Sequence, residues 1–187
     1  MITIAIIGVL ASTAASGFGA YKKKVQESEA TMILGELYRG AAAYWHRPVT
    51  AQGLGASGSG RCIVPEPGGE WEAFPPFPLV PEKRTFDFTT VPSFAALGYS
   101  KADPSYFSLG WDAFNYEVTP CGDHGDGNPV YIFHVVSDID GDGNMGGMTL
   151  GAFQRNGEIA RHIGYLDVKS FLEMMGIPCE SCAYGVD

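Results

Sequence analysis

Residues 1–24 read MITIAIIGVLASTAASGFGAYKKK. No charged side chain occurs before Lys22, and three consecutive lysines follow the uncharged run. A helix needs about 20 apolar residues to cross the hydrocarbon core of a bilayer. Residues 1–21 therefore suit a membrane anchor or a helix buried among copies of itself. A cleaved secretory signal fits less well, because such signals carry positive charge ahead of the apolar run.

The uncharged head continues into an amphipathic stem over residues 22–45. Apolar side chains recur there at helical spacings, with Lys, Glu and Arg between them: Val25, Met32, Ile33, Leu37, Ala41 and Tyr44. This periodicity predicts a helix with one packed face. Pro48, the first proline of the chain, ends the pattern. We therefore predict one N-terminal helix of about 45 residues, roughly 65 Å long at 1.5 Å per residue.

The rest of the chain differs from this segment in charge. The 187 residues hold 12 Lys and Arg against 21 Asp and Glu, which gives a net charge of −9. Residues 1–47 carry a net +2, and residues 48–187 carry a net −11. Such an acidic balance argues against nucleic acid as a partner, since nucleic-acid binders displace phosphate counterions with basic groups. The division predicts an anchor and stem over 1–47 and a globular domain over 48–187.

Residues 48–187 show turn-rich β patterning. A Gly/Ser run at 53–60 and a Pro-rich run at 65–81 predict one long surface segment over 48–85. Strand patterns follow at 84–90, 114–118, 130–136, 148–154 and 158–163, with a turn at Asn156-Gly157 and a short helix at 167–175. This order predicts an α+β fold in which a long N-terminal helix, with its apolar half protruding, packs on an antiparallel β-sheet.

Two stretches of the sequence carry a family resemblance. IAIIGVLA at 4–11, followed by a small-residue run and YKKKVQESEA at 21–30, is similar to the N-terminal helix of type IV pilins and type II secretion pseudopilins. FAALGY at 94–99 and FHVVSDIDGDG at 133–143 are similar, more loosely, to the sheet region of one pilin subgroup. The resemblance implies that the predicted α+β fold is pilin-like.

The resemblance also implies a function. It predicts a structural subunit of an extracellular, type IV pilus-like filament on the bacterial surface, a helical homopolymer of identical subunits. The filament core would hold Ile4, Ile6, Ile7, Val9 and Leu10. Before assembly, the chain would lie in the inner membrane and meet the pilus assembly machinery. A secretion pseudopilin is the alternative within the family, and a membrane-anchored calcium-binding domain that never polymerises is the alternative outside it.

Two positions depart from the family pattern. The family has a glutamate near the start of its mature chains and often a proline in the middle of the helix. This sequence has no glutamate in its apolar run, and it has Ser16-Gly17 where the proline would stand. We expect the glutamate to lie upstream of Met1, in residues that precede this sequence.

The sharpest local motif is Asp138-Ile-Asp140-Gly-Asp142-Gly-Asn144. Carboxylates at alternate positions followed by glycine match the first half of an EF-hand-type loop, and Ca²⁺ takes six to eight oxygen ligands in such sites. The motif therefore predicts Ca²⁺ as a cofactor, with Asp138, Asp140, Asp142 and Asn144 as ligands. A plain acidic turn is the alternative interpretation.

The calcium loop would be incomplete by itself. Thr149 stands where the closing glutamate of an EF-hand-type loop would be. We expect the missing oxygen ligands to come from Asp123, Asp126 or a backbone carbonyl near Gly146.

The cysteines are even in number: Cys62, Cys121, Cys179 and Cys182. In a protein outside the cytoplasm they predict two disulfides, and three connectivities are open. We favour Cys62–Cys121 and Cys179–Cys182. A zinc site would need a second closely spaced pair, and a thioredoxin-like motif would stand at the start of a helix that follows a strand.

No pattern in the sequence predicts an enzyme. Gly53-Leu-Gly55-Ala-Ser-Gly58 matches a dinucleotide fingerprint, but it follows a predicted helix where a strand is required. The four histidines show no metal-ligand spacing: His46, His124, His134 and His162. We expect His134 to be half-buried in a strand. Neither a nucleophile elbow nor a P-loop occurs. The sequence therefore predicts a structural protein.

Overall fold

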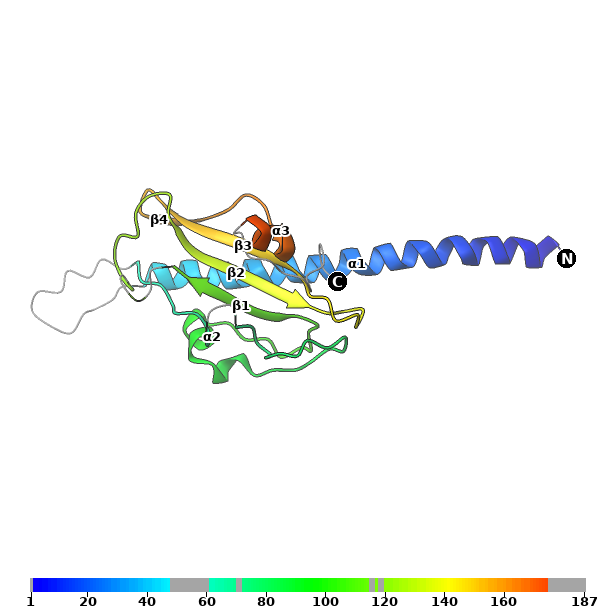
Figure 1. Ribbon diagram of the computed structural model, residues 1–187, viewed down its shortest axis with the longest axis horizontal. Helices are drawn as coiled ribbons and strands as arrows, with labels where there is room; N and C mark the ends of the chain where they lie inside the picture. Colours follow the sequence, from blue (N-terminus) through cyan, green and yellow to red (C-terminus); the bar gives the residue numbers. More distant parts are fainter. Residues whose placement is uncertain (1, 48–60, 70–71, 115–116, 118–119, 175–187) are drawn as a thin grey trace, which may run out of the picture.

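The chain folds as one helix laid along an antiparallel sheet (Figure 1). The structure is a computed structural model, and it describes residues 2–47, 61–69, 72–114, 117 and 120–174. The helices are α1 (Ile2–Trp45), the 3-10 helix η1 (Phe88–Thr90), α2 (Pro92–Leu97) and α3 (Val168–Met174). The strands are β1 (Ser108–Ala113), β2 (Pro129–Ser137), β3 (Gly146–Arg155), β4 (Glu158–Arg161) and β5 (Leu166–Asp167).

The five strands form a single antiparallel sheet in the order β1-β2-β3-β4, and β5 also pairs with β3. The centre of the sheet is the β2–β3 hairpin, in which Phe133 lies opposite Leu150. The β3–β4 turn uses Asn156 and Gly157, both with positive φ (52° and 78°). Positive φ at both central positions is what a two-residue hairpin loop requires, so the turn predicted at Asn156-Gly157 is confirmed.

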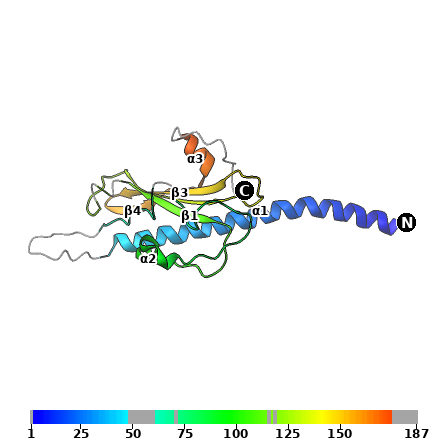
Figure 2. The ribbon, with the colours of Figure 1, turned by 60° about the horizontal axis from the view of Figure 1, so that its bottom comes forward.

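Each face of the sheet is covered by different elements. The main core lies between the sheet and α1, and it also holds the aromatic side chains of η1 and α2. A smaller cluster on the sheet includes Ile132 and Val136 of β2 and Val168 and Phe171 of α3. Figure 2 shows α1 and α3 on opposite sides of the sheet. Because β2 is covered on both faces, its sequence is almost continuously apolar.

One stripe of α1 faces the sheet. Its buried residues recur at one-turn intervals: Gln26, Ala30, Ile33, Leu34, Leu37, Ala41 and Trp45. Trp45 ends the helix, and its indole Nε1–H donates to the Gly157 carbonyl at the β3–β4 turn. The sequence-based assignment of Val25 and Met32 to the packed face is wrong, since these side chains are 48% and 55% exposed.

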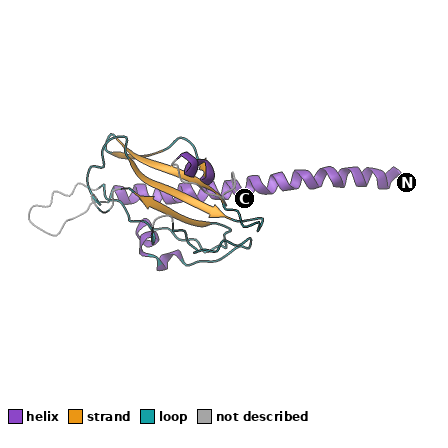
Figure 3. Cartoon of the chain, in the orientation of Figure 1, coloured by secondary structure: helices purple, strands orange, loops and turns teal. Residues whose placement is uncertain are grey.

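The segment between α1 and the sheet is mostly irregular (Figure 3). Arg84 organises part of it, because its guanidinium donates to the carbonyls of Pro76 and Pro78 and to the Ser108 hydroxyl. The strand predicted at 84–90 is wrong. Arg84 makes only an isolated bridge with Ser105, and the Asp87 carboxylate caps η1 by accepting from the Thr89 N–H. Local capping of this kind competes with strand pairing.

The remaining elements agree with the sequence to different degrees. The strands predicted at 130–136 and 148–154 are confirmed as the cores of β2 and β3, and β4 is shorter than predicted. The helix predicted at 167–175 is confirmed as α3. The strand predicted at 114–118 is wrong, because the chain pairs earlier, as β1, and Phe114 lies in a turn. The Gly/Ser run at 53–60 lies outside the described residues.

The predicted pilin-like fold class requires correction. That prediction required an N-terminal helix with an apolar half, yet across the described residues no helix is both long enough and apolar enough to cross a membrane. It also placed FAALGY with the sheet, whereas Phe94 to Leu97 lie in α2, on the α1 side of the core. The observed fold is a five-stranded antiparallel sheet with α1 on one face and α3 on the other.

His134 of β2 is an ionisable residue inside the core. It was expected to be half-buried, but only 2% of the residue is exposed. Its Nδ1 lies 3.8 Å from an Asp112 carboxylate oxygen on β1. Desolvation lowers the pKa of His134 to about 4, against a smaller opposing effect of hydrogen bonds with the backbone of Glu72 and Ile132. The neutral imidazole is therefore the form that the sheet accommodates.

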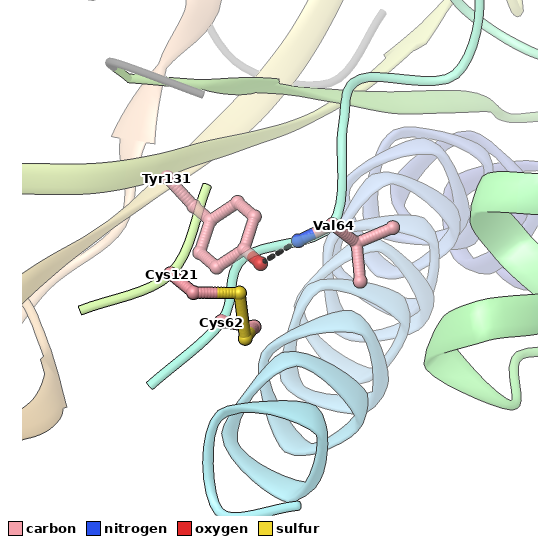
Figure 4. Close-up of a disulfide and its surroundings, with 4 residues drawn as sticks. All are labelled: Cys62, Val64, Cys121 and Tyr131. Carbon is pink, nitrogen blue, oxygen red and sulfur yellow. Dashed lines mark hydrogen bonds between the residues drawn. A yellow bond between two sulfur atoms is a disulfide. The ribbon is translucent and has the colours of Figure 1, made fainter. Parts of the chain in front are cut away.

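A disulfide closes the loop that leads from α1 into the sheet. Cys62 is bonded to Cys121, 59 positions further along the chain, as one of the predicted pairings requires. The two cysteines also form an isolated antiparallel bridge. Beside them the Tyr131 hydroxyl accepts a hydrogen bond from the Val64 N–H at 2.6 Å (Figure 4). Cys179 and Cys182 lie outside the described residues, so their pairing stays a prediction.

We predict that removing the disulfide with Cys62→Ala and Cys121→Ala lowers the free energy of unfolding by about 4 kcal/mol. The reason is that the unfolded chain gains conformational entropy when the loop between the two cysteines is no longer closed. Denaturant unfolding of the full chain in mild detergent measures the change. Tyr131→Phe is the control: it keeps the crosslink but leaves the Val64 N–H without its partner, and it should cost only about 1–3 kcal/mol. Equal losses in both variants would contradict the prediction.

We also predict that the domain loses stability as pH falls. His134 has a folded-state pKa near 4 and an unfolded pKa of about 6.5. Between these values the unfolded chain binds the extra proton, so folding stability is present above pH 6.5 and is lost progressively toward pH 4. From pH 7 to pH 5 the loss is about 2 kcal/mol. His134→Gln should lack this part of the pH dependence. An unchanged pH profile in the variant would refute the assignment to His134.

Candidate assembly surface and metal-binding turn

The helix α1 presents a second apolar stripe, away from the sheet. Among the side chains of α1 that the structure describes, five large apolar ones are exposed: Ile7 (66%), Phe18 (70%), Tyr21 (68%), Val25 (48%) and Met32 (55%). Their spacings of 11, 3, 4 and 7 positions are whole helical turns, so they lie along one face. We call these five residues the outer stripe. Sequence reasoning missed it because Val25 and Met32 were grouped with the face toward the domain, although Met32 stands five positions from Leu37 and so does not share its face.

The outer stripe bears directly on the predicted filament core. Of the five residues predicted for that core, Ile7 is exposed and belongs to the stripe. Ile4, Ile6, Val9 and Leu10 lie in α1, and their side chains are outside the described part of the structure. The structure therefore places one predicted core residue on the exposed face and leaves the other four as predictions.

The stem is fixed to the domain by a polar contact as well as by its buried stripe. A Glu29 carboxylate oxygen accepts from the Lys101 ammonium at 2.9 Å and from the Ser105 hydroxyl at 3.2 Å. The side chains of Glu29 and Lys101 are only 22% and 16% exposed. This contact joins α1 to the segment that follows α2. It sets where the covered part of the helix begins, close to Gln26, the first buried residue of α1 among those described.

The acidic motif forms the turn between β2 and β3. One oxygen from each of Asp138, Asp140 and Asp142 lies within 4.8 Å of the others. Asp138 is buried, with 8% of the residue exposed. Its carboxylate accepts hydrogen bonds from the N–H groups of Gly141 (2.9 Å) and Gly143 (3.2 Å). Both glycines have positive φ, 74° and 84°, which lets the chain curl around that carboxylate. The arrangement gathers hard oxygen atoms of the kind that Ca²⁺ prefers.

The fourth predicted ligand is tied to the third. The Asn144 N–H and side-chain amide both donate to Asp142, at 2.7 and 2.6 Å. These two bonds are the main reason why the pKa of Asp142 lies below its usual value. The turn therefore holds Asp142 in its charged form. The structure brings Asp138, Asp140, Asp142 and Asn144 into one turn, as the sequence predicted.

The additional ligands proposed from the sequence are not brought to this turn. Asp123 accepts from the Gln154 side chain, and Asp126 accepts from the Asn156 N–H. Both contacts lie at the far end of β3, ten residues long, whereas the acidic turn precedes its first residue. The Thr149 hydroxyl donates to the Leu166 carbonyl inside the sheet. The assignment of Asp123 and Asp126 as ligands is therefore wrong.

The histidines do not join a metal cluster. His46 pairs with Glu158 at 3.2 Å on the surface, and the His124 ring packs on Trp45 at the end of α1. Burial lowers the pKa of His124, and hydrogen bonding to the Arg61 backbone opposes this. Among the described residues, the acidic turn is the only place where three or more potential metal-ligating groups meet.

Chemically, the site offers two things: an apolar helical surface with no partner in the described domain, and a turn of convergent carboxylates. The first suits association with another apolar surface, and the second suits a hard divalent cation. Comparison of the chain with protein-family models, with curated proteins and with solved structures found no match.

Proposed function

We propose that the chain is a structural subunit that polymerises through α1 into an extracellular filament of the type IV pilus kind. The observation that carries this proposal is the outer stripe, a line of exposed large apolar side chains from Ile7 to Met32. Large apolar side chains that stay exposed along one face of a folded protein mark an interaction site. Burying each such side chain contributes about 1.5–3 kcal/mol.

Identical copies are the partner that best fits this stripe. Figure 1 shows α1 continuing past the sheet, so its N-terminal residues extend beyond the cover of their own domain. Residues 1–21 carry no charge, and therefore they can pack against the same segment of other copies without burying an unpaired ion. Before assembly, the same uncharged residues would be held at the inner membrane, where the assembly machinery would take up the subunit. After assembly, they would occupy the filament centre at the bacterial surface.

The charge distribution supports an arrangement with the domains outside. Residues 48–187 carry a net −11, while residues 1–47 carry a net +2. Like-charged domains repel one another, so they favour exposed positions where solvent and salt screen their charge. The helices, with little net charge, suit the interior.

We further propose that Ca²⁺ binds the β2–β3 turn and stiffens it. The proposal rests on the convergence of three carboxylates within 4.8 Å. Asp138, Asp140, Asp142 and Asn144 would hold the ion, with water supplying the remaining oxygens, since Ca²⁺ accepts water among its six to eight ligands. A cation there would offset the repulsion among the carboxylates of the turn. The ion would act on stability and not on chemistry.

We predict that placing a charge in the outer stripe abolishes filament formation without unfolding the domain. Val25→Glu and Met32→Glu each put a carboxylate into the apolar contact, where an unpaired charge costs several kcal/mol. Sedimentation and negative-stain electron microscopy of protein released from detergent measure assembly, and circular dichroism measures the fold. Ile163→Glu is the matched control, because Ile163 is a fully exposed apolar residue outside the helix. Normal filaments from both stripe variants would rule out this surface as the assembly interface.

We predict that calcium raises the thermal stability of the full chain. At a concentration about 100 times the dissociation constant, binding stabilises by about 2.7 kcal/mol, which corresponds to roughly 5–10 °C in Tm. Asp140→Asn combined with Asp142→Asn should remove this shift. Asp103→Asn, a change of an exposed carboxylate outside the turn, should keep it. A shift of equal size in all three proteins, measured by differential scanning calorimetry, would show that the ion acts elsewhere.

A further inference from the structure

A surface hollow of about 450 Å³ lies between the proline-rich segment and the acidic turn. Its apolar wall is Phe77, Pro78, Leu79 and Met145, and its polar wall is Asp138, Gly143 and Asn144. Phe77 is 52% exposed, whereas Leu79 and Met145 are half-buried against the smaller core cluster. Next to the hollow, the Pro81 ring lies beside Gly141 of the turn. The hollow therefore has an apolar surface on one side and the acidic turn on the other. Asp138 lines it, and the exposed carboxylates of Asp140 and Asp142 belong to the same turn but stand outside the lining.

This combination selects a particular kind of occupant. The apolar wall favours an aromatic or aliphatic side chain, and the carboxylates favour a cation next to it. Asp138, Asp140 and Asp142 together carry a formal −3, and the turn would keep a net −1 with a calcium ion bound. A helix that presents an apolar pair beside a lysine meets both requirements. The volume is that of a site for a few side chains and not for a whole helix.

The chain itself contains such a helical segment. Tyr21, Lys24 and Val25 stand at positions i, i+3 and i+4 of α1 and so lie together on one face. Tyr21 is 68% and Val25 48% exposed, and Lys24 is exposed as well. Two more lysines, Lys22 and Lys23, add positive charge to this part of the sequence. The segment thus has two apolar side chains for the apolar wall and a lysine ammonium for the acidic turn.

A molecule's own helix does not fill its hollow. Among the described residues, those that line the hollow come from 77–79 and 138–145, and none of them belongs to α1. The first described side chain of α1 that the domain buries is Gln26, directly after this segment. Figures 1 and 2 both show the β2–β3 turn at the end of the sheet where α1 continues toward the N-terminus. In copies that run parallel, the segment of one copy and the hollow of its neighbour therefore lie at similar heights.

We propose that the hollow between Phe77 and the acidic turn receives the Tyr21–Lys24–Val25 face of α1 from a second copy of the chain. This contact rests on the proposed polymerisation and specifies which parts of neighbouring copies meet at the base of the domain. Tyr21 and Val25 pack on the apolar wall, and Lys24 pairs with the carboxylates of the turn. The contact joins the basic end of one stem to the acidic domain of another, so it also offsets part of the repulsion among the domains.

A zero-length crosslink between copies tests the contact. Full-length chains labelled with ¹⁴N and with ¹⁵N are mixed before assembly, and the filaments are treated with a carbodiimide. The reagent adds to a carboxylate to give an O-acylisourea. The lysine amine attacks its carbonyl carbon to form an amide, and the reagent leaves as a urea that carries the displaced oxygen. We expect mass spectrometry to find mixed-isotope peptides that join Lys24 to Asp140 or Asp142. Filaments whose mixed-isotope crosslinks omit this pair would overturn the contact, while a wild-type chain that forms no filaments would overturn the proposed function itself.

A charge exchange gives a second, independent measurement. Lys24→Glu should raise the lowest protein concentration that supports assembly about tenfold, because an attractive pair becomes a repulsive one. All proteins are compared with calcium chelated, because Asp140 is also a proposed calcium ligand. Under this condition Asp140→Lys alone should do the same, and the two changes together should restore assembly to within about threefold of the wild type. Arg155→Glu, a charge reversal at an exposed site at the far end of β3, is the control and should have little effect. Additive losses in the double variant would refute the pairing.

Discussion

The burial of one stripe of α1 against the sheet is the interaction on which the rest of the structure depends. Gln26, Leu37 and Trp45 lie along that stripe, together with Ala30 and Ala41, whose small side chains leave room for the helix to lie against the strands. Because one face of the helix is used in this way, the opposite face is left to solvent along the whole domain. The outer stripe is therefore a consequence of the packing geometry as well as of composition. The two stripes give α1 two functions, one within the subunit and one between subunits.

The domain around this helix has much irregular structure, and it is stabilised by a disulfide, by side-chain hydrogen bonds and by aromatic contacts. A disulfide closes the long segment after α1, and the Arg84 guanidinium organises the proline-rich segment through two carbonyls. Aromatic rings form a continuous contact chain through the core from Phe86 to Trp111. Such rings bury large apolar areas with few residues. Together, the disulfide, the Arg84 hydrogen bonds and the aromatic core hold long irregular segments against a small sheet.

The proposed assembly and the proposed calcium site meet at the same end of the domain. The acidic turn lies where α1 leaves the cover of the sheet, and the hollow beside it is built partly from the turn itself. A cation that fixes the carboxylates would therefore also fix one wall of the contact between copies. Stability of the turn and association of subunits would be linked through one short segment of the chain. This linkage is local, since Asp123 and Asp126 belong to the other end of β3.

Patterns that depend on neighbouring residues were readable from the sequence. The helical periodicity after Lys22, the strands β2 and β3, the Asn156-Gly157 turn and the acidic turn all follow from local spacing and turn chemistry. Features that depend on distant residues were not. Spacing places Val25 and Met32 on one face of the helix and Leu37 on another, but only the sheet decides which face is covered. The place of β1 depends on Gly110, where a side chain would collide with the Glu72 carbonyl. The sequence by itself determined which elements can form, because propensity is local; the tertiary structure decided what each face touches, because burial is shared between segments far apart in the chain.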